Sequence, residues 1–470
     1  MRQIAIRREL IAVLALIAGY VALFGPLAIL RHATYHSFGD DLGIFDQIFW
    51  NTTQGRPFES TISLGIAQPH SFFGDHFSPI YWILYPFYFI FPHPETLLVI
   101  QILALGAGAL PIYLLARSRV EPGLPRLAWV LIYFLSLPVA YNSLWDFHET
   151  NLAVLPLGLA IYFLETRRMT WFIVCLLVTF LIKEEMPLIG IGFGAYILLG
   201  KRNIKLGAAV LLMSLAIFSV IVGFIIPAFA QHHSYGYVGT RYSGLGSSWR
   251  QIVLTLLTKP ITVAKVLLQR QKIAFLIGIF GPVLGLSFLA RWAVLLLLPT
   301  LGYLLLSSYP PQYSFTDHYA VTLVPLVLAT AILAIAIFSV KVRMWLTVGI
   351  VVASLIFSCA FGDMPFSRHF NFKVFRPEAR YNSFQPTLQA IPSSSSVSAE
   401  NNLTPHLTHR RYIYTYEYQG TQHADYVALD YAYTGRDTNA FENQIHQIES
   451  EGYQKIAGGQ GLALLKKRNN

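Results

Sequence analysis

The stretch IAVLALIAGYVALFGPLAIL, residues 11–30, decides the fold class of this 470-residue chain. It is uncharged and almost wholly apolar, and about 20 such residues are what an α-helix needs to cross a bilayer. Arg2, Arg7 and Arg8 precede it, and no small-residue cleavage site follows. We therefore expect an uncleaved first span rather than a signal peptide.

The composition extends this prediction to most of the chain. Hydrophobic residues make up 54% of the sequence and charged residues 12%, whereas soluble domains carry about 25% charged residues. The mean hydropathy is +0.51. The sequence thus predicts a polytopic α-helical membrane protein with about 11 transmembrane helices. They are expected near residues 10–30, 95–116, 127–141, 150–164, 171–183, 187–200, 205–229, 273–289, 292–307, 319–340 and 344–361.

Basic residues in the short connections orient these spans. If the spans lie as predicted, all the basic connections fall on one side, which the positive-inside rule identifies as the cytoplasm. Their basic residues are Arg117, Arg119, Arg126, Arg167, Arg168, Lys201, Arg202, Lys205, Arg291, Lys341 and Arg343. We expect a multi-pass protein of the plasma membrane with its N-terminus inside. The net charge of +10 then reflects topology, and we expect no nucleic-acid partner.

The first loop on the opposite side, residues 31–94, has a different character. From Arg31 to Glu95 the chain has two Arg or Lys residues and six acids. Its aromatic stretch HFSPIYWILYPFYFIF, residues 76–91, predicts a helix lying in the membrane interface, because a full span would invert the charge pattern downstream. Acids, His and Tyr gather on this side, which favours a functional site there.

The chain divides into a membrane domain, residues 1–361, and a polar C-terminal part, residues 362–470, without a spanning run. In the second part, IPSSSSVSA (391–399) reads as a loop entering a strand, three further segments read as β-strands and one as a helix. The strands are YIYTYEY (412–418), ADYVALDYAY (424–433) and LALLKKRNN (462–470), and the helix is NAFENQIHQIESEGY (439–453). This pattern predicts a small α/β domain, which the span count places outside.

The acids of FGDDLGIFDQ, residues 38–47, are the first candidates for chemistry. Asp40 or Asp41, beside aromatic neighbours, can have a raised pKa and act as a general base. The pair can also hold a divalent cation such as Mg or Mn, with His76 as a further ligand. A third possibility is that one of the two caps a helix that begins at Leu42.

Further candidates for substrate binding lie in the other outside loops. Lys183, Glu184 and Glu185 stand between two apolar runs with little room for a loop, and charges at that depth usually face a polar cavity or one another. A tight turn that carries them to the headgroups is the alternative, but the lysine is also suited to a phosphate. The remaining candidates are Asp46, Arg56, Asp75, His76, His148, Glu149, Arg241, His318 and Tyr319.

The segment HHSYGYVGTRYSGLGSSW, residues 232–249, contains Arg241 among tyrosines, glycines and serines. It is either a mobile cover over a site or a flexible connection. The sequence has no GxxxxGK[ST], HExxH or paired CxxC motif, so nucleotide hydrolysis and zinc proteolysis have no support.

Several stretches resemble the domain-of-unknown-function 2079 family of predicted membrane proteins. They are FGDDLGIFDQIFWNTTQGRPF, DHFSPIYWILYPFYFIFPHPETLL, DFHETNLAVLPL, KEEMPLIGIGFGAYIL and the tail segment VSAENNLTPHLTHRRYIY. The architecture also resembles the GT-C superfamily of membrane glycosyltransferases. This second resemblance implies transfer of a sugar from a polyprenyl-phosphate carrier, with a catalytic Asp in the first outside loop.

By that resemblance, Asp40 or Asp41 is the base that deprotonates an acceptor hydroxyl, and we favour Asp40. Lys183, Arg241 or Arg56 stabilises the departing lipid phosphate. Two other classes stay open. A transporter or flippase would line its path with charges such as those at Lys183, and a scaffold would use its outside domain to bind a partner.

Overall fold

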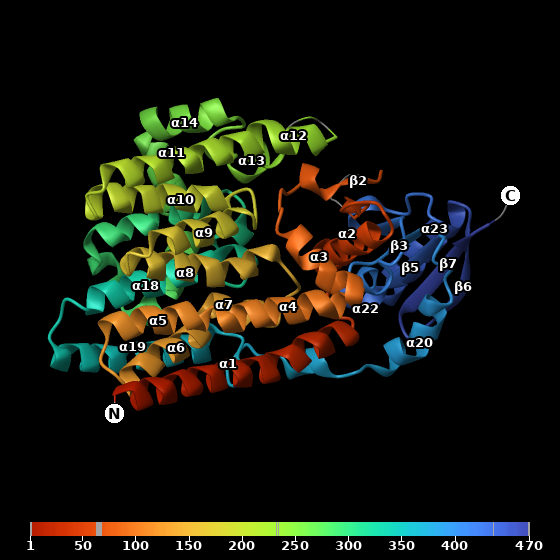
Figure 1. Ribbon diagram of the computed structural model, residues 1–470. Coiled ribbons are helices and arrows are strands. Elements are labelled where there is room, and N and C mark those ends of the chain that lie inside the picture. The colour runs from red at the N-terminus through yellow and green to blue at the C-terminus, as the bar shows by residue number, and fades with distance from the viewer. Residues whose placement is uncertain (1, 63–67, 232, 234, 436, 469–470) are drawn as a thin grey trace.

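The computed structural model describes residues 2–62, 68–231, 233, 235–435 and 437–468. The helices form a stack with broadly similar directions, and a five-stranded sheet lies at one end of it (Figure 1). Residues 63–67 of the predicted first loop and residues 469–470 of the predicted last strand lie outside the described residues.

The helices of the stack follow the predicted apolar segments. They are α1 (Arg2–Ala33), α4 (Pro94–Ala107), α5 (Ala109–Arg119), α6 (Leu124–Leu135), α7 (Leu137–Asn142), α8 (Val154–Glu165), α9 (Met169–Phe180), α10 (Met186–Ala195), α11 (Ile204–Val220), α12 (Ile226–Phe229), α16 (Arg270–Phe280), α17 (Leu298–Leu305), α18 (Leu323–Ile335) and α19 (Val340–Phe361). The loops hold α2 (Ile44–Thr53), α3 (Tyr81–Ile90), α13 (Tyr237–Arg241), α14 (Trp249–Thr258) and α15 (Pro260–Leu267). Each predicted span overlaps at least one of these helices.

Helix α18 is the centre of the stack. Every residue of it except Leu333 is buried, and it contacts α5, α8 and α16. A helix that is apolar on all sides is expected to be enclosed by others. By contrast, only 17% of the apolar window in α1 and 22% of that in α19 is buried, so both present apolar surface outward, as lipid-facing helices do.

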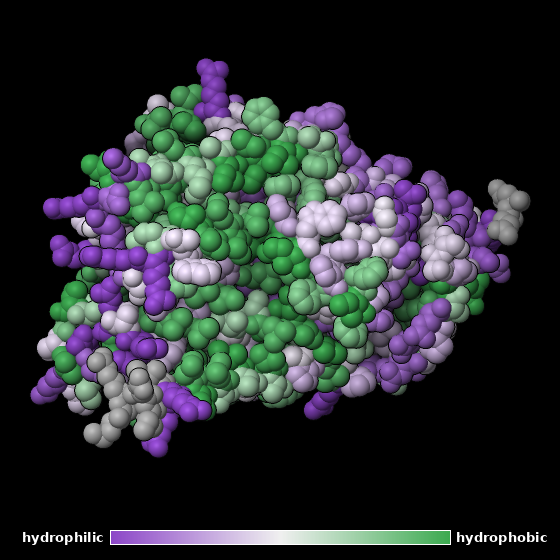
Figure 2. Space-filling view, in the orientation of Figure 1, coloured by the Kyte–Doolittle hydropathy of each residue, from purple (hydrophilic) through white to green (hydrophobic). Residues whose placement is uncertain are grey.

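Five described helical stretches are long and apolar enough to cross a bilayer, or six if the bent pair α15–α16 is one span. The five are Arg7–Ala33, Pro94–Arg119, Ile204–Phe229, Pro310–Ile335 and Val340–Phe361. Shorter apolar helices, among them α6, α9 and α10, complete the stack. In the space-filling view a hydrophobic band separates two hydrophilic ends (Figure 2). The chain is thus a mostly helical protein with several apolar helices.

The predicted basic connections meet at one end of the stack, which we call the basic end. Ion pairs link the α1, α5–α6, α8–α9, α10–α11 and α18–α19 regions there. These pairs are Arg126–Glu9 at 3.1 Å, Arg119–Glu165 at 2.8 Å, Lys201–Glu165 at 2.7 Å and Arg343–Glu121 at 2.5 Å. Four of the predicted basic connections thus lie together with the α1 region at this end.

The C-terminal part forms a mixed sheet with strand order β4-β3-β5-β7-β6. Strand β3 pairs in parallel with β4 and β5, while β7 pairs antiparallel with β5 and β6. The strands are β3 (Val397–Ala399), β4 (Ile413–Thr415), β5 (Tyr426–Asp430), β6 (Tyr453–Gly459) and β7 (Leu462–Lys467), and the helices are α20 (Ala379–Gln389), α21 (Tyr416–Gln419), α22 (Tyr431–Thr434) and α23 (Thr438–Ser450).

Each face of this sheet has its own apolar core. One core includes Phe441, Ile445 and Ile448 of α23, and the other includes residues of α20. Tyr35 and Ile62 from the first loop join the second core. The sheet and helices of the C-terminal part, which we call the C-terminal unit, therefore pack directly against the first loop.

Three predictions about local structure need correction. The predicted strand 412–418 ends at Thr415, because residues 416–419 form α21. The predicted strand 424–433 likewise ends at Asp430, because residues 431–434 form α22. The helix expected to start at Leu42 begins earlier, with a π-helical turn η1 (Gly39–Gly43) that runs into α2. Neither Asp40 nor Asp41 caps it, since its N-terminal flanking residue is Phe38.

Helix α3 lies in the predicted interfacial stretch. Its 10 residues span only about 15 Å, half the thickness of a bilayer core. Tyr81, Leu84 and Tyr88 face the protein, whereas Trp82, Phe87 and neighbouring apolar side chains are at least half exposed.

Candidate active site

Asp41 lies at the end of the stack that carries the C-terminal unit. Its Oδ1 is 3.0 Å from Nε2 of His148, and its Oδ2 accepts a hydrogen bond of 3.1 Å from the Trp145 indole. Its side chain is 22% exposed. The side chain can therefore be reached by a substrate while two neighbours fix its orientation.

A buried ion pair holds the turn that carries Asp41. Arg31 at the end of α1 lies 2.5 Å from Asp146, which also accepts a 2.6 Å hydrogen bond from the backbone N–H of Phe38. Removing one partner of such a buried pair costs about 3–5 kcal/mol, because the other charge stays buried. Asp146 thus positions the start of η1.

The surroundings set opposite pKa shifts in Asp41 and His148. Burial alone raises the pKa of Asp41, but the charge of His148 and hydrogen bonds from His148 and Trp145 outweigh burial and bring it below its ordinary value. Burial lowers the pKa of His148, and Asp41 more than compensates, so the result is raised. The two side chains therefore favour an ion pair near neutral pH.

An aromatic path leads from this pair into the protein. The His148 ring stacks on that of His318 with centroids 3.6 Å apart, and His318 lies 3.9 Å from the ring of Tyr319. Both His318 and Tyr319 belong to the turn η10 (His318–Thr322), which leads into α18. The buried central helix α18 thereby holds His318 and Tyr319 in position.

Lys183 is buried and already paired. Its Nζ lies 2.9 Å from Oε1 of Glu149 and 5.7 Å from the ring centroid of Tyr319. Both partners of the ion pair are at most 3% exposed. The lysine predicted to meet a phosphate therefore has its charge balanced within the protein.

Arg241 is the contrasting cation. Its guanidinium lies 4.2 Å from the ring centroid of Tyr237, 5.4 Å from that of Tyr309 and 5.3 Å from that of Tyr319. It also donates a 3.2 Å hydrogen bond to the hydroxyl of Tyr319. Among the residues that the structure describes, no carboxylate forms an ion pair with it. This half-buried charge is available to an anion.

Glu184 connects the first loop, at residues 76–77, to the segment that carries Tyr235 and Arg241. It accepts hydrogen bonds from the Tyr235 hydroxyl at 3.1 Å and the Phe77 N–H at 3.2 Å, and lies 2.7 Å from Nδ1 of His76. His76 stacks on Tyr237 at 4.9 Å. Burial raises the pKa of Glu184 and lowers that of His76, so it disfavours charge on both. The described part of this segment from Tyr235 on is thus anchored beside Glu184 and His76.

Glu185 follows this pair at the start of α10. Burial is the main cause that raises its pKa to about 7, and the neighbouring Lys183 opposes the shift. Among the described residues its carboxylate forms no ion pair. It adds a titratable group next to the polar network, the name we give to the contacting residues Asp41, His148, Glu149, Lys183, Glu184, Arg241, His318 and Tyr319.

Several polar atoms in this network are buried without a hydrogen-bond partner among the described residues. They are Oε2 of Glu149, the hydroxyls of Ser78 and Tyr81, which lie close enough to interact with one another, and Nε2 of His318. The Tyr81 ring also lies within reach of the Glu149 charge. Since native proteins leave few buried polar atoms unpaired, this group suits a polar molecule such as water or a substrate hydroxyl.

Asp40 points away from this network, toward the C-terminal unit. Its Oδ1 accepts a 2.7 Å hydrogen bond from Asn401, and its Oδ2 accepts one of 3.1 Å from Tyr418. Burial, and next the charge of Asp41, raise its pKa. The two adjacent acids thus face different neighbours, and only Asp41 contacts His148.

Three other predicted residues lie outside the network. Asp46 is fully buried, contacts the hydroxyls of Tyr88 and Thr408, and lies 3.3 Å from His409, so it locks the first loop to the C-terminal unit. The other two have local partners: Arg56 bonds Asn51 at 2.7 Å, and Asp75 lies 3.0 Å from His70.

The residues predicted to hold a divalent cation do not converge. Asp40, Asp41 and His76 each have separate partners, as described above. Among the described residues, no group of three or more His, Cys, Asp or Glu side chains is placed to hold a metal ion. This donor set does not fit Mg or Mn, and we derive no step through a metal.

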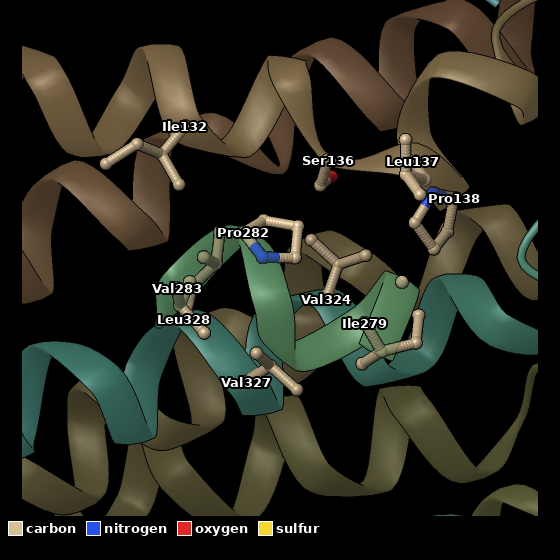
Figure 3. A pocket seen from close by; sticks show the side chains of 11 residues that line it. Ile132, Ser136, Leu137, Pro138, Ile279, Pro282, Val283, Val324, Val327 and Leu328 are labelled. Carbon is tan, nitrogen blue, oxygen red and sulfur yellow. The ribbon is translucent and has the colours of Figure 1, made fainter. Parts of the chain in front are cut away.

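A small apolar cavity lies deeper in the stack, between α6–α7, α16 and α18 (Figure 3). Its walls include Ile132, Pro138, Ile279, Val324 and Val327, with Ser136 as a polar side chain. Such a lining offers no group for chemistry, so the polar network is the better candidate site.

Some residues that shape the site were not predicted. Asn401, Tyr418 and Tyr433 lie around Asp40, and Tyr81 lies beside Glu149, but none was among the candidates. A signal existed for Asn401, because Glu-Asn-Asn follows the strand β3, and binding groups often lie at the carboxyl ends of parallel strands. The tyrosines carry no such signal in a chain with 26 of them.

Comparison with known proteins bears on the fold. The model of the DUF2079 family, described as a predicted membrane protein, matches residues 31–464. The solved structure of ArnT from Cupriavidus metallidurans bound to undecaprenyl phosphate is similar, with a TM-score of 0.54 and 12% sequence identity. The likeness covers 95% of this chain and 98% of that one. No curated protein matches. At this identity the likeness concerns the fold, and it confirms the predicted resemblance to GT-C proteins at that level.

Proposed function

This chain belongs to the DUF2079 family of predicted membrane proteins, and from that premise we propose that it is an integral-membrane glycosyltransferase. It moves a sugar from a polyprenyl-phosphate donor to an acceptor hydroxyl on the extracytoplasmic face of the plasma membrane. The proposal includes about 11 spans, a cytoplasmic N-terminus at the basic end, and an extracytoplasmic C-terminal unit. The partners are membrane lipid and the lipid-linked sugar.

The observation that carries the proposal is an accessible carboxylate and a cation without a carboxylate in direct contact, both in one polar network. Asp41 can accept a proton from an acceptor hydroxyl, and Arg241 can bind a lipid phosphate. His148, His318 and Tyr319 connect the two. The network also contains buried polar atoms suited to sugar hydroxyls.

The reaction follows from these placements. The acceptor oxygen forms a bond to the anomeric carbon as its proton passes to the Asp41 carboxylate. The bond between that carbon and the phosphate oxygen breaks, and its electron pair leaves with the polyprenyl phosphate. Arg241 stabilises the departing charge. A carboxylate with a lowered pKa is a weak base, which suits a transition state in which the anomeric carbon is already cationic.

The position of the polar network gives less support to a transporter than to a glycosyltransferase. The network sits at the end of the stack beside the C-terminal unit. A transport path needs polar groups near the middle of the membrane, usually at broken helices. The likeness to a fold solved with undecaprenyl phosphate bound also favours a lipid-phosphate substrate over the scaffold alternative.

Undecaprenyl phosphate is therefore expected to stabilise the purified chain against heat, because only the native state has the Arg241 site. Undecaprenol, which lacks the phosphate, is the matched control and should have little effect. The measurement is the Tm of the chain in detergent with each lipid. Equal shifts for the two lipids, or none, would count against lipid-phosphate recognition.

A further inference from the structure

The parallel strands of the C-terminal sheet end next to the proposed active site. From β3 the chain passes to β4 on one side and then to β5 on the other, so β3 is the point at which the strand order reverses. In open α/β sheets, ligands bind outside the carboxyl ends of the strands at such a point. The residues just after β3 are Glu400, Asn401 and Asn402.

Asn401 contacts the loop that carries the two acids. Its carbonyl accepts a 2.7 Å hydrogen bond from the N–H of Gly39, and its side-chain oxygen accepts one of 3.1 Å from the N–H of Asp40. Its side-chain nitrogen donates to Asp40 Oδ1 at 2.7 Å. The strand ends are thereby fixed directly beside Asp41.

Aromatic side chains surround this junction. Phe38 lies between Trp145 and Tyr433, with ring centroids 5.7 and 5.9 Å away. Tyr433 is 37% exposed and Tyr418, which donates to Asp40, is 47% exposed. We call Phe38, Asp40, Trp145, Asn401, Tyr418 and Tyr433 the strand-end surface. Trp145 connects it to Asp41 through the indole hydrogen bond.

Charge restricts what this surface can bind. The described arginines Arg31 and Arg380 are both in ion pairs already. Arg31 lies 2.5 Å from Asp146, and Arg380 lies 2.5 Å from Asp430. The acids Asp40 and Glu417 border the surface, and Glu417 accepts a 2.9 Å hydrogen bond from the Asn401 N–H. An anionic acceptor would be repelled here. A molecule with many neutral hydroxyls suits amides, carboxylates and amphipathic tyrosine rings.

We propose that the strand-end surface binds the acceptor and that this acceptor is a neutral glycan. The inference rests on the proposed glycosyl transfer and adds the substrate class. The apolar face of a sugar ring packs against Tyr418 and Tyr433, while its hydroxyls bond to the Asp40 carboxylate and the two tyrosine hydroxyls, and Asn401 holds Asp40 in place. The reacting hydroxyl reaches Asp41, which Trp145 joins to this surface.

The test is binding of the full chain, in lipid nanodiscs, to an array of immobilised neutral and acidic bacterial-envelope oligosaccharides. The wild-type chain should bind one or more neutral glycans, and the double variant Tyr418→Ala/Tyr433→Ala should bind them at least ten-fold more weakly. Ile456→Ala is the matched control, because Ile456 is 49% exposed on β6, the edge strand farthest from β4, and should bind as wild type.

The array separates this inference from the proposed function. Asp41→Asn should keep glycan binding, since the acid acts in transfer. Glycan binding that needs the two tyrosines, without sugar transfer by the wild type, would overturn the glycosyltransferase proposal alone. Transfer without neutral-glycan binding, preference for acidic glycans, or full binding by the double variant would overturn the acceptor proposal.

Discussion

Asp41→Asn should lower the rate of sugar transfer at saturating substrates by about 10²–10⁴-fold, the usual loss when a general base is removed. The amide keeps the size of the carboxylate and can still accept the Trp145 hydrogen bond of 3.1 Å. It cannot take the acceptor proton, and it no longer balances the charge of His148. The measurement is kcat of the reconstituted chain, with Tm recorded to verify folding.

Asp40→Asn is the matched comparison, because it changes the adjacent acid in the same way. Asp40 contacts Asn401 and Tyr418 rather than His148. Its loss should therefore raise the KM for the acceptor and change kcat by less than about ten-fold. If Asp40→Asn abolished kcat while Asp41→Asn retained it, the roles assigned here would be reversed.

Arg241→Gln should weaken binding of the lipid phosphate by about 10–100-fold, which corresponds to losing one or two charge-assisted hydrogen bonds. Its guanidinium is held by tyrosine rings rather than by a carboxylate. The substitution therefore breaks no direct ion pair, although it removes a positive charge that acts on Glu184 and Glu185, and stability should change less than in Lys183→Met. The measurements are the KM for the donor and the Tm shift caused by undecaprenyl phosphate.

Two further variants test whether the phosphate site lies at Arg241 rather than at another cation. Lys183→Met should lower Tm strongly, because it leaves Glu149 charged, buried and unpaired. Arg250→Gln, which removes an exposed cation at the start of α14, should behave as wild type. If Lys183→Met abolished the undecaprenyl-phosphate shift at unchanged Tm and Arg241→Gln did not, the phosphate site would lie at Lys183.

Much of the fold could be predicted from local signals. Apolar length located the helical segments, and the charge asymmetry placed Arg119, Arg126, Lys201 and Arg343 together, as their ion pairs show. The C-terminal strand and helix patterns were also largely right. Strand β6 was missed, because QKIAGG lacks the alternation of apolar residues that marks a half-buried strand.

The candidate site was harder to predict, because its geometry depends on long-range packing. Residue type alone identified Asp41, His148, Lys183 and Arg241 from four separate loops. It could not show that Lys183 is balanced by Glu149 while Arg241 lacks such a partner. Nor could it separate the adjacent acids, since a π-helical turn aims Asp41 at His148 and Asp40 at the C-terminal unit.

The most direct test of the central claim is the fate of a lipid-linked sugar in proteoliposomes that contain the purified chain. Undecaprenyl-phosphate donors with radiolabelled sugars are supplied with glycan acceptors, and products are separated after incubation. A glycosyltransferase releases undecaprenyl phosphate and transfers label to the glycan, and Asp41→Asn prevents both. Movement of intact donor across the bilayer, with its sugar–phosphate bond unbroken and no dependence on Asp41, would contradict the account and indicate a transporter.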